Sequence, residues 1–167
     1  MVDKTHEDLS TQQETKERHH LRFEFWTKLL PKIKSQSPIF QNTNPSRDHW
    51  LSAGGTGISG LVYNFLITRT YAAVELAISK SDTKENKQLF DELIKYKDEI
   101  NNAFGQELSW ERLDNKKMCR IALYKEGVNI FVREDWEKMI DFLVSNMIKL
   151  EQTMREPLRK VKQNLNE

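Results

Sequence analysis

The residues with the most evident chemistry form a short glycine-rich run. Residues 55–60 read Gly-Thr-Gly-Ile-Ser-Gly, and four of the six glycines of the chain lie between Gly54 and Gly60. This spacing is typical of a dinucleotide-binding unit, in which the glycines turn a strand into a helix whose N-terminus holds a pyrophosphate. It is also typical of the phosphate loop of protein kinases, which joins two strands.

The residues after the glycine run argue against a nucleotide site. Residues 61–68 are mostly apolar, aromatic or β-branched, which predicts a strand where the dinucleotide unit needs a helix. Glu75 follows the glycine run at the spacing where a dinucleotide-binding unit has its ribose-binding acid. It lies, however, in a strand that is predicted to pair with residues 61–68 as a hairpin. The sequence has no His-Arg-Asp or Asp-Phe-Gly kinase motif, and Leu61 and Val62 stand where a Walker loop has Lys and Ser or Thr. We therefore expect a tight structural loop or a flexible flap.

Two further groups of polar residues could form catalytic or metal sites. Asp48, His49 and Ser52 are residue types of a catalytic triad, but neighbours in sequence seldom meet in the geometry that a triad needs. His19 and His20 are adjacent on a predicted helix, so their side chains point about 100° apart and cannot share one metal ion. We expect no cofactor and no metal site from these residues.

An aromatic residue and several cations occur close together near residue 115. The stretch 112–125 holds five basic residues and one acidic residue, a local charge of +4. Strands are predicted at residues 108–113 and 118–124, and alternation along them could place Trp110 and cations such as Arg120 on one face. Such a face would contact phosphates and stack on bases. A solvated edge strand protected by charge explains the same residues.

Two predicted strands lie between the glycine-rich run and the basic stretch. Residues 61–68 and 71–79 have strand character and are separated only by Arg69 and Thr70, which predicts an antiparallel hairpin. In the second strand, Ala73, Glu75 and Ala77 fall on one face. A shorter strand is expected around Trp50.

Three helices are predicted around these strands. Apolar residues recur every four positions from Leu21 to Ile33, and a capping box at Ser10 marks the start of this helix. A second helix is expected from Asp82 to a stop at Gly105. A third runs from about residue 136 to 154, where its methionines fall at core positions, and Pro157 divides it from a basic tail.

The composition is that of one folded domain. At 167 residues, a chain can bury about 70% of the surface that it exposes when unfolded. No apolar run approaches the roughly 20 residues of a membrane helix, and the polar, acidic N-terminus is unlike a secretory signal, so we expect a cytoplasmic protein without membrane contact. The single cysteine, Cys119, excludes an internal disulfide and is expected to be buried. We expect a flexible lead at residues 1–11, one α+β domain at residues 12–158, with a mixed or antiparallel sheet of about 4–6 strands, and a basic tail at residues 159–167.

Several ordered motifs resemble one family. They are Trp50-Leu-Ser-Ala-Gly-Gly-Thr-Gly-Ile-Ser-Gly, Val74-Glu-Leu, Glu85-Asn-Lys, Trp110-Glu-Arg-Leu-Asp, Arg120-Ile and Asp135-Trp. Together they are similar to an uncharacterised bacterial and archaeal family, domain of unknown function 4268, over roughly residues 18–158. Members of that family often follow a domain that resembles a restriction-type nuclease. This sequence shows no such domain ahead of the motifs, so we do not expect a nuclease activity on the basis of the resemblance alone.

The predicted order of helix, short strand, two strands, helix and strand is also that of the restriction-endonuclease-like core. That core needs an acid on one strand and, on the next, an Asp or Glu, any residue and then Lys, because clustered carboxylates bind the metal and the lysine orients water or steadies charge. The matching strand reads Glu75, Leu76 and Ala77, and Asn64 is the nearest polar residue of the preceding strand. A core of this type would have a degenerate active site.

Three functions are compatible with the sequence. The first is a non-catalytic accessory module that binds a nucleic acid or a partner nuclease in nucleic-acid processing or defence. Its surface would comprise Trp50, Gly55, Gly57, Gly60, Trp110, Arg112, Lys117 and Arg120. The second is a protein-interaction or assembly domain, including a homo-oligomer, which the near-zero net charge and the apolar C-terminal helix favour. The third is a divergent metal-dependent nuclease that uses Glu75, Asp48 or Glu111.

Overall fold

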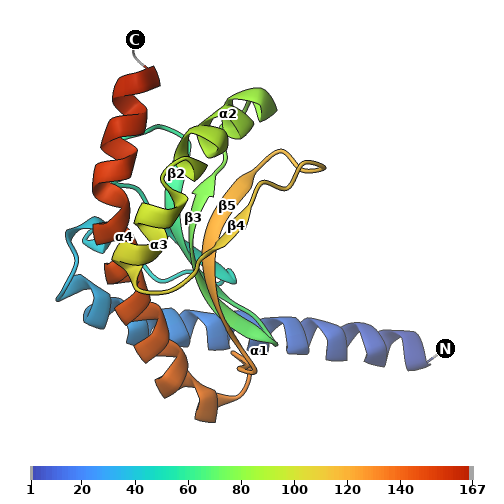
Figure 1. The fold of residues 1–167 in the computed structure, drawn as a ribbon. Coiled ribbons are helices and arrows are strands. Elements are labelled where there is room, and N and C mark those ends of the chain that lie inside the picture. The colour runs from blue at the N-terminus through green and yellow to red at the C-terminus, as the bar shows by residue number, and fades with distance from the viewer. Residues whose placement is uncertain (1, 166–167) are drawn as a thin grey trace.

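A five-stranded antiparallel sheet is the centre of the fold (Figure 1). A computed structural model of the chain describes residues 2–165, and their side chains from residue 11 onward. The strands are β1 Trp50–Ala53, β2 Leu61–Ile67, β3 Tyr71–Ile78, β4 Ser109–Glu111 and β5 Cys119–Glu126, in the spatial order β1-β2-β3-β5-β4. β2 and β3 form the predicted hairpin, which Thr68 and Tyr71 close through backbone and hydroxyl hydrogen bonds of 2.9 Å. The α+β class and the central hairpin are confirmed, whereas a restriction-endonuclease-like core is not.

The helices cover one face of this sheet. They are α1 Val2–Lys34, α2 Thr83–Ile94, α3 Lys97–Phe104 and α4 Trp136–Leu165, with short 3-10 turns η1 Pro38–Phe40 and η2 Arg133–Asp135. α4 lies across the sheet, and α2 and α3 lie beside α4 (Figure 1). The C-terminal half of α1 packs into the same layer, where the rings of Trp26 and Phe65 lie 6.2 Å apart. The N-terminal half of α1 extends beyond the sheet, and its side chains from residue 11 to 18 are exposed.

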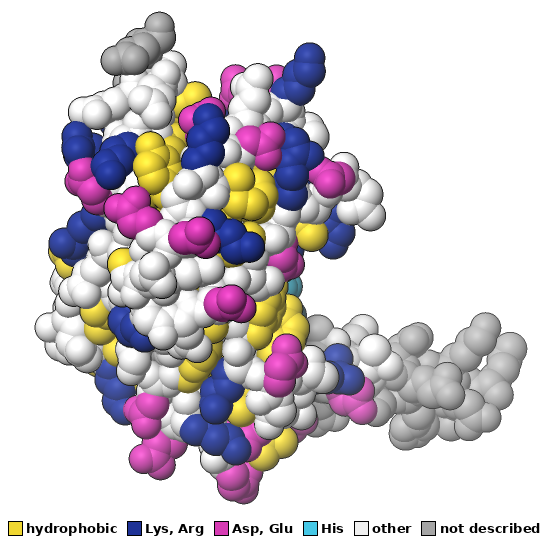
Figure 2. Space-filling view, in the orientation of Figure 1, with side chains coloured by type: hydrophobic (Ala, Val, Ile, Leu, Met, Phe, Trp, Pro, Cys, Tyr) yellow, Lys and Arg dark blue, Asp and Glu magenta, His cyan; other side chains and the backbone are white. Residues whose placement is uncertain are grey.

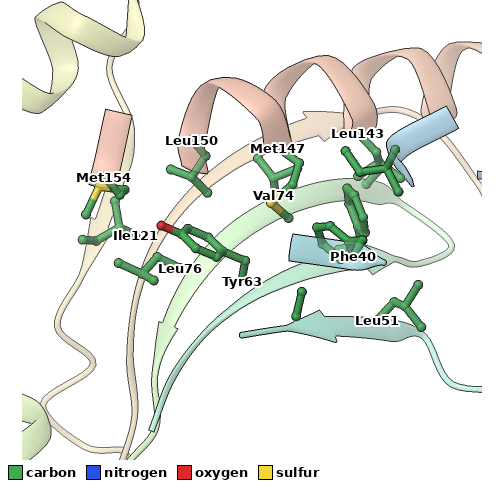
Figure 3. Packing of buried hydrophobic residues seen from close by; sticks show 14 of the residues in the cluster. Phe40, Leu51, Tyr63, Val74, Leu76, Ile121, Leu143, Met147, Leu150 and Met154 are labelled. Atoms are coloured by element: carbon green, nitrogen blue, oxygen red, sulfur yellow. The ribbon is translucent and has the colours of Figure 1, made fainter. Parts of the chain in front are cut away.

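Strand alternation divides the sheet into an apolar face and a polar face. Tyr63, Val74, Leu76 and Ile121 point toward the helices and pack against the apolar stripe of α4 (Figure 3). The methionines of that stripe are fully buried, as their spacing predicted, and are Met139, Met147 and Met154. Phe40 of η1 stacks on Phe65 in the same core, with ring centroids 4.9 Å apart.

The second predicted helix is divided into two. Asp82 caps α2 as expected, since its carboxylate accepts the backbone N–H groups of Lys84 and Glu85. The helix breaks at Tyr96, whose N–H donates to the carbonyl of Leu93 in a 3-10 geometry, and α3 then ends at Gly105 in the left-handed conformation. Both halves keep the helical spacing of buried residues, so the periodicity did not reveal the break. Before the break α2 contacts β3, β5 and α4, and after it α3 contacts α4.

The outer helices are longer than their sequence signals indicated. α1 already includes Val2, so the capping box at Ser10 does not begin it. α4 continues through Pro157, and Val161 is fully buried, so the residues expected to form a basic tail are helical as far as Leu165. The expected flexible lead lies almost entirely among residues whose side chains are outside the described part, as do Asn166 and Glu167 at the other end.

Candidate functional site

The glycine-rich run forms a closed structural loop between β1 and β2. Gly55, Gly57 and Gly60 have φ values of +91°, +77° and +86°, which residues with a side chain rarely adopt. The Thr56 hydroxyl lies 2.9 Å from the carbonyl oxygens of Ile58 and Leu61, and the Ile58 side chain is buried in the core. A Cβ on Gly60 would collide with the Lys80 side chain. The strand that the sequence predicted after the loop is present, and the loop itself is packed rather than open.

The loop does not close over the polar face of the sheet. Residues 57–59 line a hollow of about 370 Å³ together with residues of α2 and α4, among them Leu89 and Lys162. None of residues 54–60 lines the groove that contains Glu75. Gly55, Gly57 and Gly60 therefore belong to a different surface from Trp50 and Arg120.

Trp110 and Arg120 lie on opposite faces of the sheet. In the β4–β5 register, Trp110 pairs with Ile121, whereas Glu111 pairs with Arg120. The Trp110 ring packs edge-on against Phe90 at 6.2 Å, on the helical side. The combined aromatic and cationic face predicted for these strands is therefore absent from this part of the structure.

The other predicted cations of this region lie on the loop between β4 and β5. Arg112 forms ion pairs with Asp91, at 2.9 Å, and with Asp114. Lys117 is exposed. The buried Lys87 side chain fixes the base of the loop, because its Nζ donates to three backbone carbonyls at 2.6–2.9 Å. The basic stretch is thus a loop anchored by Lys87, and its Arg112 and Lys117 belong to neither face of a strand.

The face of the sheet that carries no helix bears a row of polar side chains that crosses all five strands. Ser52 of β1 donates its hydroxyl to Asn64 of β2, and the Asn64 amide donates to Glu75 Oε1 at 3.0 Å. Arg120 Nε of β5 lies 3.5 Å from Glu75 Oε2 and 3.9 Å from Glu111 Oε1 of β4. Tyr124 completes the row by donating its hydroxyl to Glu111 Oε2 at 2.6 Å. We call this set the polar row.

The polar row carries more negative than positive charge. Glu75 is only 3% exposed, and Glu75 and Glu111 face the single guanidinium of Arg120. Burial opposes the charge of Arg120, but the adjacent carboxylates outweigh it and raise the pKa of that side chain. Burial and the hydrogen bond to Glu111 raise the pKa of Tyr124, so its hydroxyl stays protonated. With both acids ionised, the net charge of the row is −1.

A groove of about 470 Å³ lies over the polar row. Its floor includes Glu75 and Ala77, and the cross-strand partner of Glu75 is Ala122, so small side chains flank the buried acid. Trp50, which is 43% exposed, and Tyr71 line one end of the groove. The Tyr71 ring packs edge-on against Tyr124 at 5.3 Å.

Three arginines converge at that same end. The guanidinium carbons of Arg18 and Arg22 lie 5.6 Å from the centroid of the Phe131 ring, and that of Arg69 lies 5.7 Å from it. We call these three residues with Phe131 the arginine cluster. His49 and Thr68 line both the groove and the hollow that holds the cluster, so the two are continuous.

No carboxylate within residues 11–165 forms an ion pair with the three arginines of the cluster. Glu14 and Glu17 line a hollow together with Arg18, Arg69 and Phe131, so acidic side chains lie near the cluster without pairing with it. Burial and the charge of Arg18 lower the pKa of Arg22, which the charge of Asp48 partly offsets. The pKa of His49 is lowered by burial and by Arg22. Three guanidinium groups without an ion-paired carboxylate therefore lie at one end of the groove.

Buried polar atoms without a hydrogen bond are concentrated in this site. Among the described side chains they are Arg22 Nε, Glu75 Oε2 and Arg120 Nε. The first belongs to the arginine cluster and the other two to the polar row. The two atoms of the polar row face each other as an ion pair at 3.5 Å, so of the three only Arg22 Nε has no oppositely charged partner in an ion pair.

The structure brings together only part of the predicted site. Trp50, Glu75, Glu111 and Arg120 share the polar face, but Asp48 is exposed outside the groove and its backbone carbonyl accepts from the Trp26 indole at 2.9 Å. The arginine cluster and the tyrosines were missed. The alternation of β2 and β3 could have indicated Asn64 and Tyr71, because they share the face of Glu75. The cluster had no such signal, since its members come from three separate segments.

Two further searches of the described residues gave negative findings. From residue 11 to 165, no group of three or more His, Cys, Asp or Glu side chains is arranged to hold a metal ion. Within residues 2–165, no helix has the length and apolarity needed to span a membrane.

Comparison with known proteins identifies a family. No curated protein and no solved structure matched the chain. The family model described as Domain of unknown function (DUF4268) matches residues 21–158, which include all five strands, the whole polar row and every residue that lines the groove. This confirms the resemblance that the sequence motifs indicated, and the chain belongs to the DUF4268 family.

Proposed function

We propose that this chain is a non-catalytic module that binds single-stranded nucleic acid along the polar face of its sheet. The observation that carries the proposal is the convergence of Arg18, Arg22 and Arg69 on one ring without an ion-paired acid. Like charges held together repel one another, and an anion placed among them relieves this repulsion for all three at once. Guanidinium groups suit phosphate oxygens because they donate in pairs.

The groove beside the cluster supports a single strand rather than a duplex. Bases of a single strand are free to stack on aromatic side chains, and stacking contributes about 1–3 kcal/mol per base. Trp50 and Tyr71 offer such rings on an uncovered sheet, directly beside the arginines. Phosphates at the cluster and bases over the groove would place each chemical group against a matching surface.

The rest of the surface gives no support for a broad duplex footprint. The net charge of the chain is +1, so positive charge is local rather than general. On the side that carries the helices, acidic and basic side chains are interspersed (Figure 2). A small cluster next to an aromatic groove is better matched to a short single strand.

The test is a fluorescence anisotropy titration with labelled single strands about 12 nucleotides long, as DNA and as RNA. We expect binding that weakens steeply with salt, because phosphate contacts release counterions. The double variant Arg18→Ala, Arg69→Ala should lose most of this affinity. Its matched control is Lys116→Ala, Lys117→Ala, which removes the same charge from the exposed loop between β4 and β5 and should bind as the parent does.

Two outcomes would refute the proposal. Absence of binding at low salt would refute it directly, because phosphate contacts are strongest there. An equal loss in both double variants would show that net charge, and not the cluster, governs binding. A protein partner is the second candidate, which the exposed residues 11–18 of α1 and the 43% exposed Phe23 favour. In that case α1 variants would change self-association or capture of a partner without any nucleic-acid binding.

A further inference from the structure

A hollow of about 510 Å³ lies along α1, outside the groove and the arginine cluster. Its lining side chains are all basic or aromatic: Lys16, His19, His20 and Phe23 come from α1, and Arg47 comes from the loop before β1. We call it the α1 hollow. Its composition differs from that of the polar row, where acids outnumber bases, so it calls for a different ligand group.

Phe23 presents an aromatic ring without a stacking partner in this hollow. The residue is 43% exposed. Within residues 11–165, no other aromatic ring packs against Phe23 and no cation lies over its ring. A ring in this situation can take a nucleic-acid base on its face, because every base has a flat π-surface.

Lys16 and Arg47 bring positive charge to the same hollow. Within residues 11–165, neither side chain forms an ion pair. The carboxylate of Glu24 contacts His20 at 2.6 Å, but Arg133 lies 2.7 Å from the same carboxylate and balances its charge. The hollow therefore attracts an anion beside a free aromatic ring, and a nucleotide unit combines these two requirements as phosphate and base.

The α1 hollow adjoins the arginine cluster through two elements. On α1, His19 of the hollow and Arg22 of the cluster are three residues apart, which makes them neighbours on the helix surface. On the loop before β1, the carbonyl of Arg47 accepts from Arg22 Nη1 at 3.5 Å, and His49 then lines both the cluster and the groove. Asp48, between these two loop residues, lines neither hollow. A strand that leaves the groove at the cluster therefore meets the α1 hollow next.

We infer that a single strand bound at the groove and the arginine cluster continues into the α1 hollow, which is a second site of phosphate and base contact. This inference rests on the proposed binding of single-stranded nucleic acid. One base stacks on Phe23, while Lys16 and Arg47 contact the phosphates on either side of it. The strand then follows cations without an ion-paired acid from the end of the groove to α1.

The experiment is an anisotropy titration of the full chain with labelled oligothymidylates of about 4, 8, 12 and 16 nucleotides, which span the usual site sizes of single strands. Phe23→Ala should weaken binding of the longest strand about tenfold and leave the shortest strand, which the groove and the cluster hold by themselves, unchanged. Phe23→Trp keeps an aromatic ring and should bind every strand as the parent does. Arg47→Ala should lower the salt slope for the longest strand by about one unit. Ile94→Ala, which removes a 38% exposed apolar side chain of α2, is the control and should change nothing.

The possible failures are distinguishable. If Phe23→Ala binds the longest strand as tightly as the parent does, the inference is overturned and the proposed function stands. An equal loss for the shortest and the longest strand would also overturn it, because the substitution would then act through the packing of α1. Binding of a polyglutamate peptide that requires Phe23, with strand binding that does not, would assign the hollow to an acidic protein partner and overturn the inference. Failure of the parent chain to bind any strand at low salt would instead refute the proposed function itself.

Discussion

The substitution Arg69→Met tests whether the arginine cluster serves binding rather than stability. Methionine keeps an apolar side chain over Phe131 and removes one charge. The guanidinium carbons lie 5.6–5.7 Å from the centre of that ring, so any two are separated by no more than about twice that distance. At ~10 Å and an effective dielectric constant of ~40–80, each pair of like charges costs about 0.4–0.8 kcal/mol.

Two opposing terms then decide the stability of the variant. Removing Arg69 relieves its repulsion with Arg18 and Arg22, roughly 1 kcal/mol in all. It also removes one cation–π contact, worth about 0.5–1 kcal/mol at an exposed site. We therefore expect the free energy of unfolding to change by less than about 1 kcal/mol. Affinity for a single strand should nevertheless fall about tenfold, because a charge-assisted phosphate contact is lost.

Urea unfolding and anisotropy measured on the same preparations check both expectations. The slope of log affinity against log salt should also decrease by about one unit. Lys117→Met is the matched control and should change neither quantity, since Lys117 is exposed and does not line the groove or the hollow of the arginine cluster. A loss of stability above about 2 kcal/mol in Arg69→Met would assign the cluster a structural role and contradict this reasoning.

Three further changes test other parts of the structure. Lys87→Met should lower the free energy of unfolding by about 2–4 kcal/mol, because three carbonyls lose their donor, and urea unfolding without such a loss would contradict this. Gly60→Ala should cost about 1–3 kcal/mol because φ is +86° and Lys80 occupies the space, whereas Gly54→Ala, with open space around it, should be nearly neutral. The pKa of His49, followed by NMR, should lie below the ~6.5 of the denatured chain. The unfolded state then takes up the proton more readily, so the contribution of His49 to stability is lost as the pH falls below ~6.5, and a bound oligonucleotide should raise this pKa.

Much of the fold could be predicted because its signals are local. The hairpin of β2 and β3 follows from two apolar segments that only Arg69 and Thr70 separate, and the start of α2 follows from the cap at Asp82. The break at Tyr96 could not be predicted, because the buried residues of α2 and those of α3 keep one helical period across it.

The candidate site was less accessible to sequence reasoning, because it depends on register and on tertiary contacts. A shift of one residue between β4 and β5 would have placed Trp110 opposite Arg120, and side-chain alternation alone does not fix that register. The contact of Arg18 and Arg22 with Arg69 forms only when α1 passes the end of the hairpin. Glu75 and Arg120 were identified from the sequence, but their shared face and missing hydrogen bonds were not.

The two halves of the proposed site differ in how firmly the fold holds them, and this difference favours a division of roles. The polar row lies in the middle of paired strands, where a change of register would turn the whole apolar face of Tyr63 and Leu76 away from the helices. Its atoms are therefore fixed, which a specific contact with a ligand requires. The arginine cluster is made of long side chains from a helix and a turn, which can adjust to a phosphate at different positions. Selectivity is thus expected from the rigid floor, and affinity from the adaptable end of the groove.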